Sequence, residues 1–129
     1  MSCMIMSQNS LEESQKTLLQ SFGEITDILK AISHPNRFKI LILLLDGSKT
    51  FQTLLDKTKL KKSALANHLT HLKDKLLIDK IQHGMYFITH DGKNFVQAIK
   101  SAYTQSEEFK LQYRLAKSFL DRKKETRTE

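Results

Sequence analysis

The sequence predicts a mainly α-helical fold with one small β-hairpin, and three observations support this. Apolar residues recur every three or four positions over most of the 129 residues, which is the spacing that places them on one face of a helix. The period changes once, between residues 77 and 89, where β-branched and aromatic residues flank a His-Gly pair. Only four glycines and one proline interrupt the pattern. A chain of this length is expected to form one domain around an ordinary apolar core.

Residues 10–33 form the first expected helix. Their apolar residues make one helical stripe, and Ser10 with Glu13 matches a capping box. The helix is expected to end before Pro35, because proline disfavours helical geometry at the residue that precedes it. Residues 1–9 are expected to be a disordered N-terminus.

Three shorter helices are expected next. The second helix, residues 36–46, is apolar on nearly every side and is predicted to be the buried centre. A third helix at residues 50–57 is joined by a short turn to a fourth at residues 62–76. The fourth helix has one narrow stripe of leucines and an otherwise polar surface; the stripe comprises Leu65, Leu69, Leu72 and Leu76.

A β-hairpin and a long last helix complete the pattern. The hairpin covers residues 77–89, with Gly84 supplying the positive φ that a tight turn needs. The last helix, residues 93–120, carries apolar residues at heptad-like spacing. Residues 121–129 are wholly polar and are expected to form a frayed tail.

The order of these elements predicts a winged helix-turn-helix. A short helix joined by a tight turn to a helix with a polar outer face is the helix-turn-helix arrangement, and residues 50–76 fit it. The second helix of such a pair can enter the major groove of DNA. The hairpin at residues 77–89 can then lie against the flanking backbone as a wing. We therefore expect a single winged-helix domain over residues 10–120.

Positive charge is concentrated where the helix-turn-helix and the wing are expected. The chain has a net charge of +7, and residues 30–94 alone carry +7. Residues 1–29 carry −3 and residues 95–129 carry +3. A basic surface attracts polyanions, of which nucleic acid is the commonest. From the charge alone, a DNA-binding surface and a surface that only keeps the protein soluble are equally good explanations. The sequence motifs distinguish between them.

Two segments resemble the ArsR family of transcriptional repressors. Residues 29–41, LKAISHPNRFKIL, resemble the ALAHPTRLRIL segment that opens the family's second helix. Residues 60–72, LKKSALANHLTHL, resemble its LSQSTVSHHLKVL recognition element. The segment Leu76-Leu77-Ile78 is similar to the GLV that leads into the family's wing, with Leu76 in place of the glycine. The resemblance covers roughly residues 25–103.

This resemblance implies a homodimer that binds a palindromic operator and is paired through the first and last helices, residues 10–33 and 93–120. The apolar stripes support this independently, because each long helix would otherwise expose aliphatic residues. Packing of both stripes on the chain's own core is the alternative. A two-fold dimer would select an inverted repeat with half-sites ~34 Å apart. The expected interface residues are Leu18, Phe22, Ile25, Ile99, Tyr103, Phe109 and Tyr113.

The DNA contacts that the resemblance implies lie mostly in the fourth helix. Asn67 can bond adenine bidentately, and Ala64 can touch a thymine methyl. The positions matching the family's base-reading face are Lys62, Ser63, Ala64, Asn67, His68 and His71. The residues suited to phosphates are Lys61, Lys62, Lys73 and Lys75. The expected contacts elsewhere are Lys80, His83 and Gly84 on the wing, with Arg37 and Lys49 as outlying contacts to the DNA backbone.

The family's usual metal switches are absent from the sequence. The thiolate pair of some relatives aligns with Thr50 and Gln52, which are not soft ligands. Residues 93–129 contain no histidine to match the ligands that others carry on the last helix. No cofactor is expected. Cys3 is the only cysteine, so an internal disulfide is excluded, and a redox role for its thiol stays open.

The sequence gives no support for an enzyme or for a membrane-spanning protein. It has no glycine-rich phosphate loop, nucleophile triad or clustered carboxylate pair. The longest aliphatic run, residues 40–45, is far shorter than the ~20 residues of a membrane span. The sequence therefore predicts a cytoplasmic, sequence-specific DNA-binding regulator, most simply a repressor.

Two further hypotheses stay open. A small effector of unknown identity would sit between the dimerisation helices, where several aromatic residues gather. The alternative function is a winged-helix protein–protein interaction module of a larger assembly. Such a module would be expected to expose aliphatic residues on the fourth helix, where this sequence has Lys, Ser, Asn and His.

Overall fold

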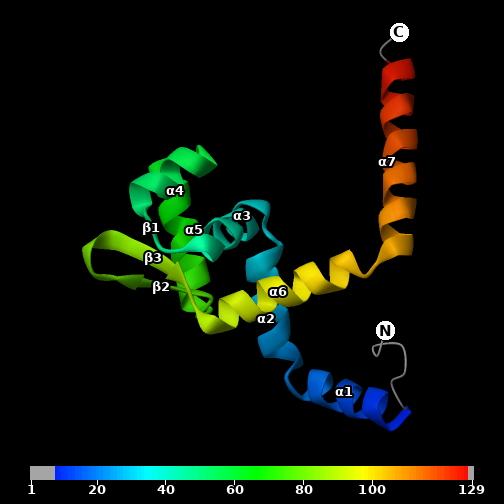
Figure 1. Cartoon of the computed structure of the whole chain (residues 1–129), viewed down its shortest axis with the longest axis horizontal. Helices are drawn as coiled ribbons and strands as arrows, with labels where there is room; N and C mark the ends of the chain where they lie inside the picture. The colour runs from blue at the N-terminus through cyan, green and yellow to red at the C-terminus, as the bar shows by residue number, and fades with distance from the viewer. Residues whose placement is uncertain (1–7, 128–129) are drawn as a thin grey trace. The chain divides into compact units, whose positions relative to one another are not determined.

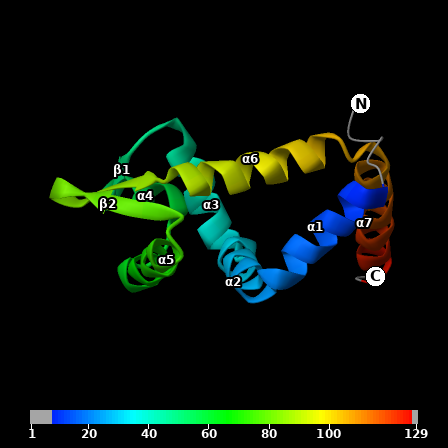
Figure 2. The ribbon, with the colours of Figure 1, turned by 90° about the horizontal axis from the view of Figure 1, so that it is seen from below.

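The computed structural model describes residues 8–127, with side chains described as far as residue 124. It confirms the mainly helical fold class, with one small antiparallel sheet (Figures 1 and 2). The chain divides into two compact units, with the boundary between Gly92 and Lys93. The first unit holds the helix-turn-helix and the wing, and the second holds most of the last two helices.

The first expected helix is in fact two helices. α1 spans Gln8–Gln20 and α2 spans Phe22–Ser33. Ser21 between them has φ −111° and ψ 23°, outside helical geometry. The prediction of one helix was wrong here, because a continuous apolar stripe does not show a local change of backbone direction. Gly23, a weak helix former, lies two residues beyond the break.

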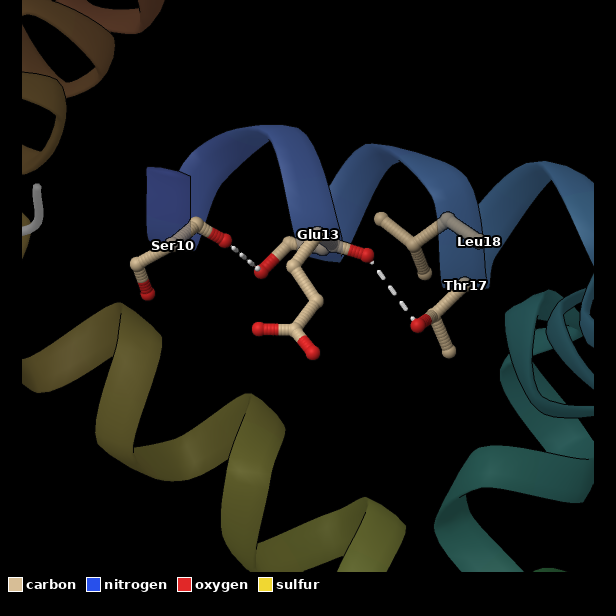
Figure 3. Close-up of a pocket in the computed structure, with 5 residues that line it drawn as sticks. Ser10, Glu13, Thr17 and Leu18 are labelled. Carbon is tan, nitrogen blue, oxygen red and sulfur yellow. Dashed lines mark hydrogen bonds between the residues drawn. The ribbon is translucent and has the colours of Figure 1, made fainter. Parts of the chain in front are cut away.

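α1 begins earlier than the capping pattern predicted. Because Gln8, the first described residue, is already helical, Ser10 lies inside the helix rather than at its cap. Residues 8 and 9 are therefore helical, while residues 1–7, including Cys3, lie outside the described residues. Hydroxyl groups bond the backbone along one face of α1: Ser14 Oγ donates to the Ser10 carbonyl at 3.0 Å, and Thr17 Oγ1 to the Glu13 carbonyl at 3.1 Å (Figure 3).

The core of the first unit is built around α3, which spans Pro35–Leu43 and continues into a 3-10 turn, Leu44–Asp46. His34 caps α3, because its Nδ1 accepts the Asn36 N–H at 3.1 Å. The helix is not buried on every side as predicted, since Ile42 is 46% exposed. The fully buried side chains are Ile40, Leu41, Leu44, Leu54, Leu65, Leu69, Leu72, Leu77 and Ile78.

The helix-turn-helix is formed by α4, Phe51–Thr58, and α5, Lys62–Asp74. The Oγ1 of Thr50 caps α4 by accepting the Thr53 N–H at 3.1 Å. The turn between the helices passes through Lys59, whose φ of 58° is left-handed. The buried leucines of α5 hold it against α2, α3, α4 and the sheet, so its opposite face is left in solvent.

The sheet contains the predicted hairpin and one strand that was not predicted. β2 spans Ile78–Ile81 and pairs antiparallel with β3, Met85–Ile88. β1, Lys49–Thr50, adds to the other edge of β3, giving the order β1-β3-β2. A two-residue polar strand has no alternating pattern to detect. The turn Gln82–Gly84 places both His83 and Gly84 at positive φ, 69° and 74°.

The long last helix predicted at residues 93–120 is divided into α6, His90–Thr104, and α7, Glu107–Arg127. Side chains fix the corner between them: Ser106 Oγ donates to the Tyr103 carbonyl at 2.7 Å, and Lys110 Nζ to the Thr104 carbonyl at 3.2 Å. α7 also continues beyond Leu120, so the expected frayed tail is helical as far as Arg127. Lys, Arg and Glu are good helix formers even without apolar contacts.

None of the described helices is both long and apolar enough to cross a bilayer.

Candidate nucleic-acid interface

α5 has a buried face and an exposed polar face. Leu65, Leu69 and Leu72 point into the core, and His68 lies beside them. The opposite face is polar and basic, and α5 lies next to the sheet that carries the wing (Figures 1 and 2). The residues exposed along α5 and its cap are Lys61, Lys62, Ser63, Ala66, Asn67, Thr70, His71, Lys73 and Asp74.

The structure brings most of the predicted base-reading residues together on this face. Lys62, Ser63, Asn67 and His71 are exposed, and Ala64 is half-buried at its edge. Ala66 and Thr70, which were not predicted as contacts, share the face. Their spacing from Ser63 and Asn67 could have predicted this, since residues three or four apart lie on the same face of a helix.

Lysines surround both ends of α5. Lys61 is the N-cap residue and makes no side-chain capping bond in the described structure. The backbone N–H groups in the first turn of α5 are therefore open to solvent, next to the exposed side chains of Lys61 and Lys62. Lys73 is exposed in the last turn. Lys75 differs from the others, because its ammonium lies 4.0 Å from the Asp27 carboxylate of α2. That contact is partly exposed, and it places Lys75 beside α2 rather than on the polar face of α5.

The wing presents two basic side chains at and near its tip. Lys80 on β2 is exposed, with its ammonium 5.7 Å from the centre of the Tyr86 ring. His83 is exposed in the turn, and Gly84 provides the turn's positive φ rather than a side chain.

His68 is placed differently from the other predicted base contacts. Its side chain is 9% exposed, and its ring centre lies 4.5 Å from that of His34. Burial lowers the pKa of the His68 imidazole, and the nearby His34, Arg37 and His71 lower it further. A base contact by His68 does not fit this burial, which arises because the residue follows the leucine stripe and not the polar face.

Arg37 and Lys49, expected as outlying contacts to DNA phosphates, stabilise the protein's own fold. The Arg37 guanidinium donates to the carbonyls of Ala31 at 2.8 Å and Lys30 at 3.2 Å, which caps the last turn of α2. Lys49 forms an ion pair with Asp46 that lowers the pKa of this carboxyl group.

The two positions aligned with the family's thiolate pair have other uses. Thr50 caps α4, and Gln52 Nε2 donates to the Asp56 carboxylate at 2.9 Å. Among the residues whose side chains are described, no three histidine, cysteine, aspartate or glutamate side chains gather as a metal site would require.

The predicted interface residues are apolar but mostly exposed in the single chain. In the first unit Phe22 is 62% exposed, Leu18 is exposed and Ile25 is half-buried. In the second unit Phe109 is 58% exposed and stacks on Tyr113, with ring centres 5.8 Å apart. The remaining two, Ile99 and Tyr103, are also exposed.

A tight turn between α4 and α5, a polar outer face on α5 and an adjoining antiparallel wing define a winged helix-turn-helix. Comparisons with known proteins agree. The model of the family described as "Bacterial regulatory protein, arsR family" matches residues 34–80. The arsenical resistance operon repressor of Staphylococcus xylosus is 30% identical over 79 residues, which are 59% of this chain and 76% of that protein.

Solved structures show the same fold. HlyU from Vibrio cholerae is 25% identical with a TM-score of 0.59, over 66% of this chain and 97% of that one. A homodimeric winged helix-turn-helix DNA-binding domain from Mycobacterium bovis is 20% identical with a TM-score of 0.62, over 74% and 90% of the two chains. The chain belongs to the ArsR family of bacterial regulatory proteins, and it is a DNA-binding transcriptional regulator rather than an enzyme.

Proposed function

We propose that this regulator acts as a homodimeric repressor that binds an inverted-repeat operator in bacterial cytoplasm. The observation that carries the proposal is the polar, basic face of α5, which is exposed beside the wing while the leucines of the same helix are buried. Such a helix fits the major groove, whose width is ~12 Å.

The side chains of this face divide into two roles. Asn67 and Ser63 can hydrogen-bond base edges, and Ala64 can contact a thymine methyl. His71 lies one turn further along the same face and completes the base-reading set. The lysines supply phosphate contacts, which give affinity without sequence information; they are Lys61, Lys62 and Lys73 on the helix and Lys80, with His83, on the wing.

Exposed apolar residues on the helices that precede and follow the helix-turn-helix and wing in the sequence support a dimer. Leu18 and Phe22 in the first unit, and Tyr103, Phe109 and Tyr113 in the second, are too exposed to serve the core of a single chain. Burying them against a second copy would remove this apolar surface from water. A small effector, if the regulator takes one, would use the same aromatic side chains.

The protein–protein module is not favoured. That function calls for aliphatic side chains on the outer face of α5, and the leucines of α5 are buried in the core. The exposed residues of the helix are polar or charged apart from Ala66.

Selection of bound duplexes from a random pool tests the proposed function. We expect enrichment of an inverted repeat whose half-sites are about one helical turn, ~34 Å, apart. Native mass spectrometry of the complex should show two chains on one duplex. Failure to enrich any sequence, or binding of one chain to an asymmetric site, would contradict the proposal.

A further inference from the structure

A pair of imidazoles lies where α5 is seated on the junction of α2 and α3. His68 projects from the buried side of α5, and its Nδ1 is buried with no hydrogen-bond partner among the described residues. Its ring is tilted by 45° to that of His34, the residue that joins α2 to α3. Buried polar atoms without partners are rare, so this one calls for an explanation.

The charges around His68 all oppose its protonation. After burial itself, the groups that lower its pKa are His34, Arg37 of α3 and His71 of α5, and none of these is a carboxylate. Asp27 of α2 lies against Lys75. The charged residues of α4 and β2, which also pack against α5, are exposed; they are Asp56, Lys57, Asp79 and Lys80. The ring is therefore held neutral near pH 7.

We propose that His68 is a positioning residue for DNA recognition: its neutral ring, packed against His34, seats α5 on the α2–α3 junction, and its protonation unseats α5 and weakens DNA binding in acid. The proposal rests on the proposed function, in which α5 reads DNA. Protonation would place a second cationic group beside Arg37 in a buried site without an acceptor, and hydrating that charge requires the helix to loosen. Asn67, the neighbouring residue, would lose its fixed position with the helix.

The sign of the effect separates His68 from the exposed histidines. Protonation of His71 and His83 adds positive charge to the DNA-facing surface, which strengthens binding to phosphates. Protonation of His68 acts in the opposite direction. An unperturbed imidazole titrates near 6.5, and because the pKa of His68 is lowered, its effect develops as the pH falls below that value.

Fluorescence anisotropy with a labelled random-sequence duplex, at constant ionic strength between pH 7.5 and 5, tests the proposal on the full chain. The affinity of the wild type should fall as the pH is lowered, because protonation of the buried His68 ring opposes the seated position of α5. In His68→Gln the fall should disappear or become a rise. The matched control is His90→Gln, which removes an exposed imidazole outside the proposed DNA surface and should behave as the wild type.

A fall in His68→Gln equal to that of the wild type, or a steady rise in the wild type, would overturn the role of His68 and leave the proposed function intact. Absence of DNA binding at pH 7.5 would overturn the proposed function and this proposal with it. The wild type alone provides a second measurement if His68→Gln fails to fold. Its His68 imidazole should titrate below the usual value near 6.5 by NMR, and the amides of α5 should exchange faster, after correction for intrinsic rates, as His68 protonates. Unchanged exchange in α5 would also refute the proposal.

Discussion

At the scale of single residues, we propose different roles in DNA binding for two side chains of α5. Lys62 and Asn67 are both exposed on the polar face. An ammonium group bonds any phosphate, whereas a carboxamide can pair with the two hydrogen-bonding groups of adenine. Affinity and specificity can therefore be lost separately.

Replacing Asn67 by Ala should relax sequence preference by roughly 1–3 kcal/mol, while Lys62→Ala should weaken binding to all sequences about equally. Competition of the selected operator against single-base variants measures both effects. Equal loss of binding to every duplex in both variants would contradict these separate roles.

Arg37 makes contacts within the chain that the sequence did not predict. An arginine in a basic segment is expected to meet DNA, yet this guanidinium donates to two carbonyls at the end of α2. The unsatisfied carbonyls of a helix end attract a cation from six or seven residues away. Sequence spacing gave no sign of this, because the bond depends on the turn at His34 and Pro35.

At the scale of elements, the sequence predicted the helices of the DNA-binding part well, and it predicted breaks within long helices poorly. Leucine spacing located α5 and its buried face at Leu65, Leu69 and Leu72, and the change of period located the hairpin. Leu76, predicted as the fourth residue of this stripe, instead lies beyond the end of α5 with φ 60° and is 70% exposed. The breaks at Ser21 and near Ser106 were missed, because the apolar stripes run through both. β1 was missed because its pairing partner lies over 30 residues away.

Two glycines allow the effect of helix propensity on stability to be compared with the effect of close packing. Gly23 in α2 has open space around it, so Gly23→Ala should raise the free energy of unfolding by about 0.5–1 kcal/mol. A Cβ at Gly92 would lie only 2.8 Å from Cγ1 of Ile88 and closer still to the Leu77 carbonyl oxygen. Gly92→Ala should therefore cost roughly 1–3 kcal/mol.

Urea denaturation of both variants measures these free energies. The wild type is the reference, and the two substitutions add the same methyl group. Effects of the same sign and size at both positions would show that contacts around Gly92 do not control the start of α6.

At the scale of the whole molecule, the chain combines a buried core in the DNA-binding part with helices that have little core of their own. α1 has no buried residue, and the side chains of α7 described up to residue 124 are nearly all exposed. Yet both helices carry large apolar side chains. Helices of such length gain most of their stability from packing, which is why we propose that a second copy covers them.

Phe109→Asp with Tyr113→Asp should weaken the dimer, because buried aromatic side chains commonly contribute about 2 kcal/mol or more each to an interface. Sedimentation velocity over a concentration series should show the variant as a monomer where the wild type is a dimer. Ser118→Asp, which adds a charge at an exposed polar position on a different face of α7, is the control. A wild type that stays monomeric throughout, or a variant that dimerises equally well, would refute the proposed interface.

The central claim is that the basic face of α5 binds DNA, and the salt dependence of binding tests it most directly. The logarithm of affinity should fall linearly with the logarithm of salt concentration, with a slope of about −0.9 per phosphate neutralised. Substituting both Lys61 and Lys62 by Ala should make the slope shallower by about two phosphate contacts per chain. Absence of binding at low salt, or a slope unchanged by the double substitution, would contradict the claim.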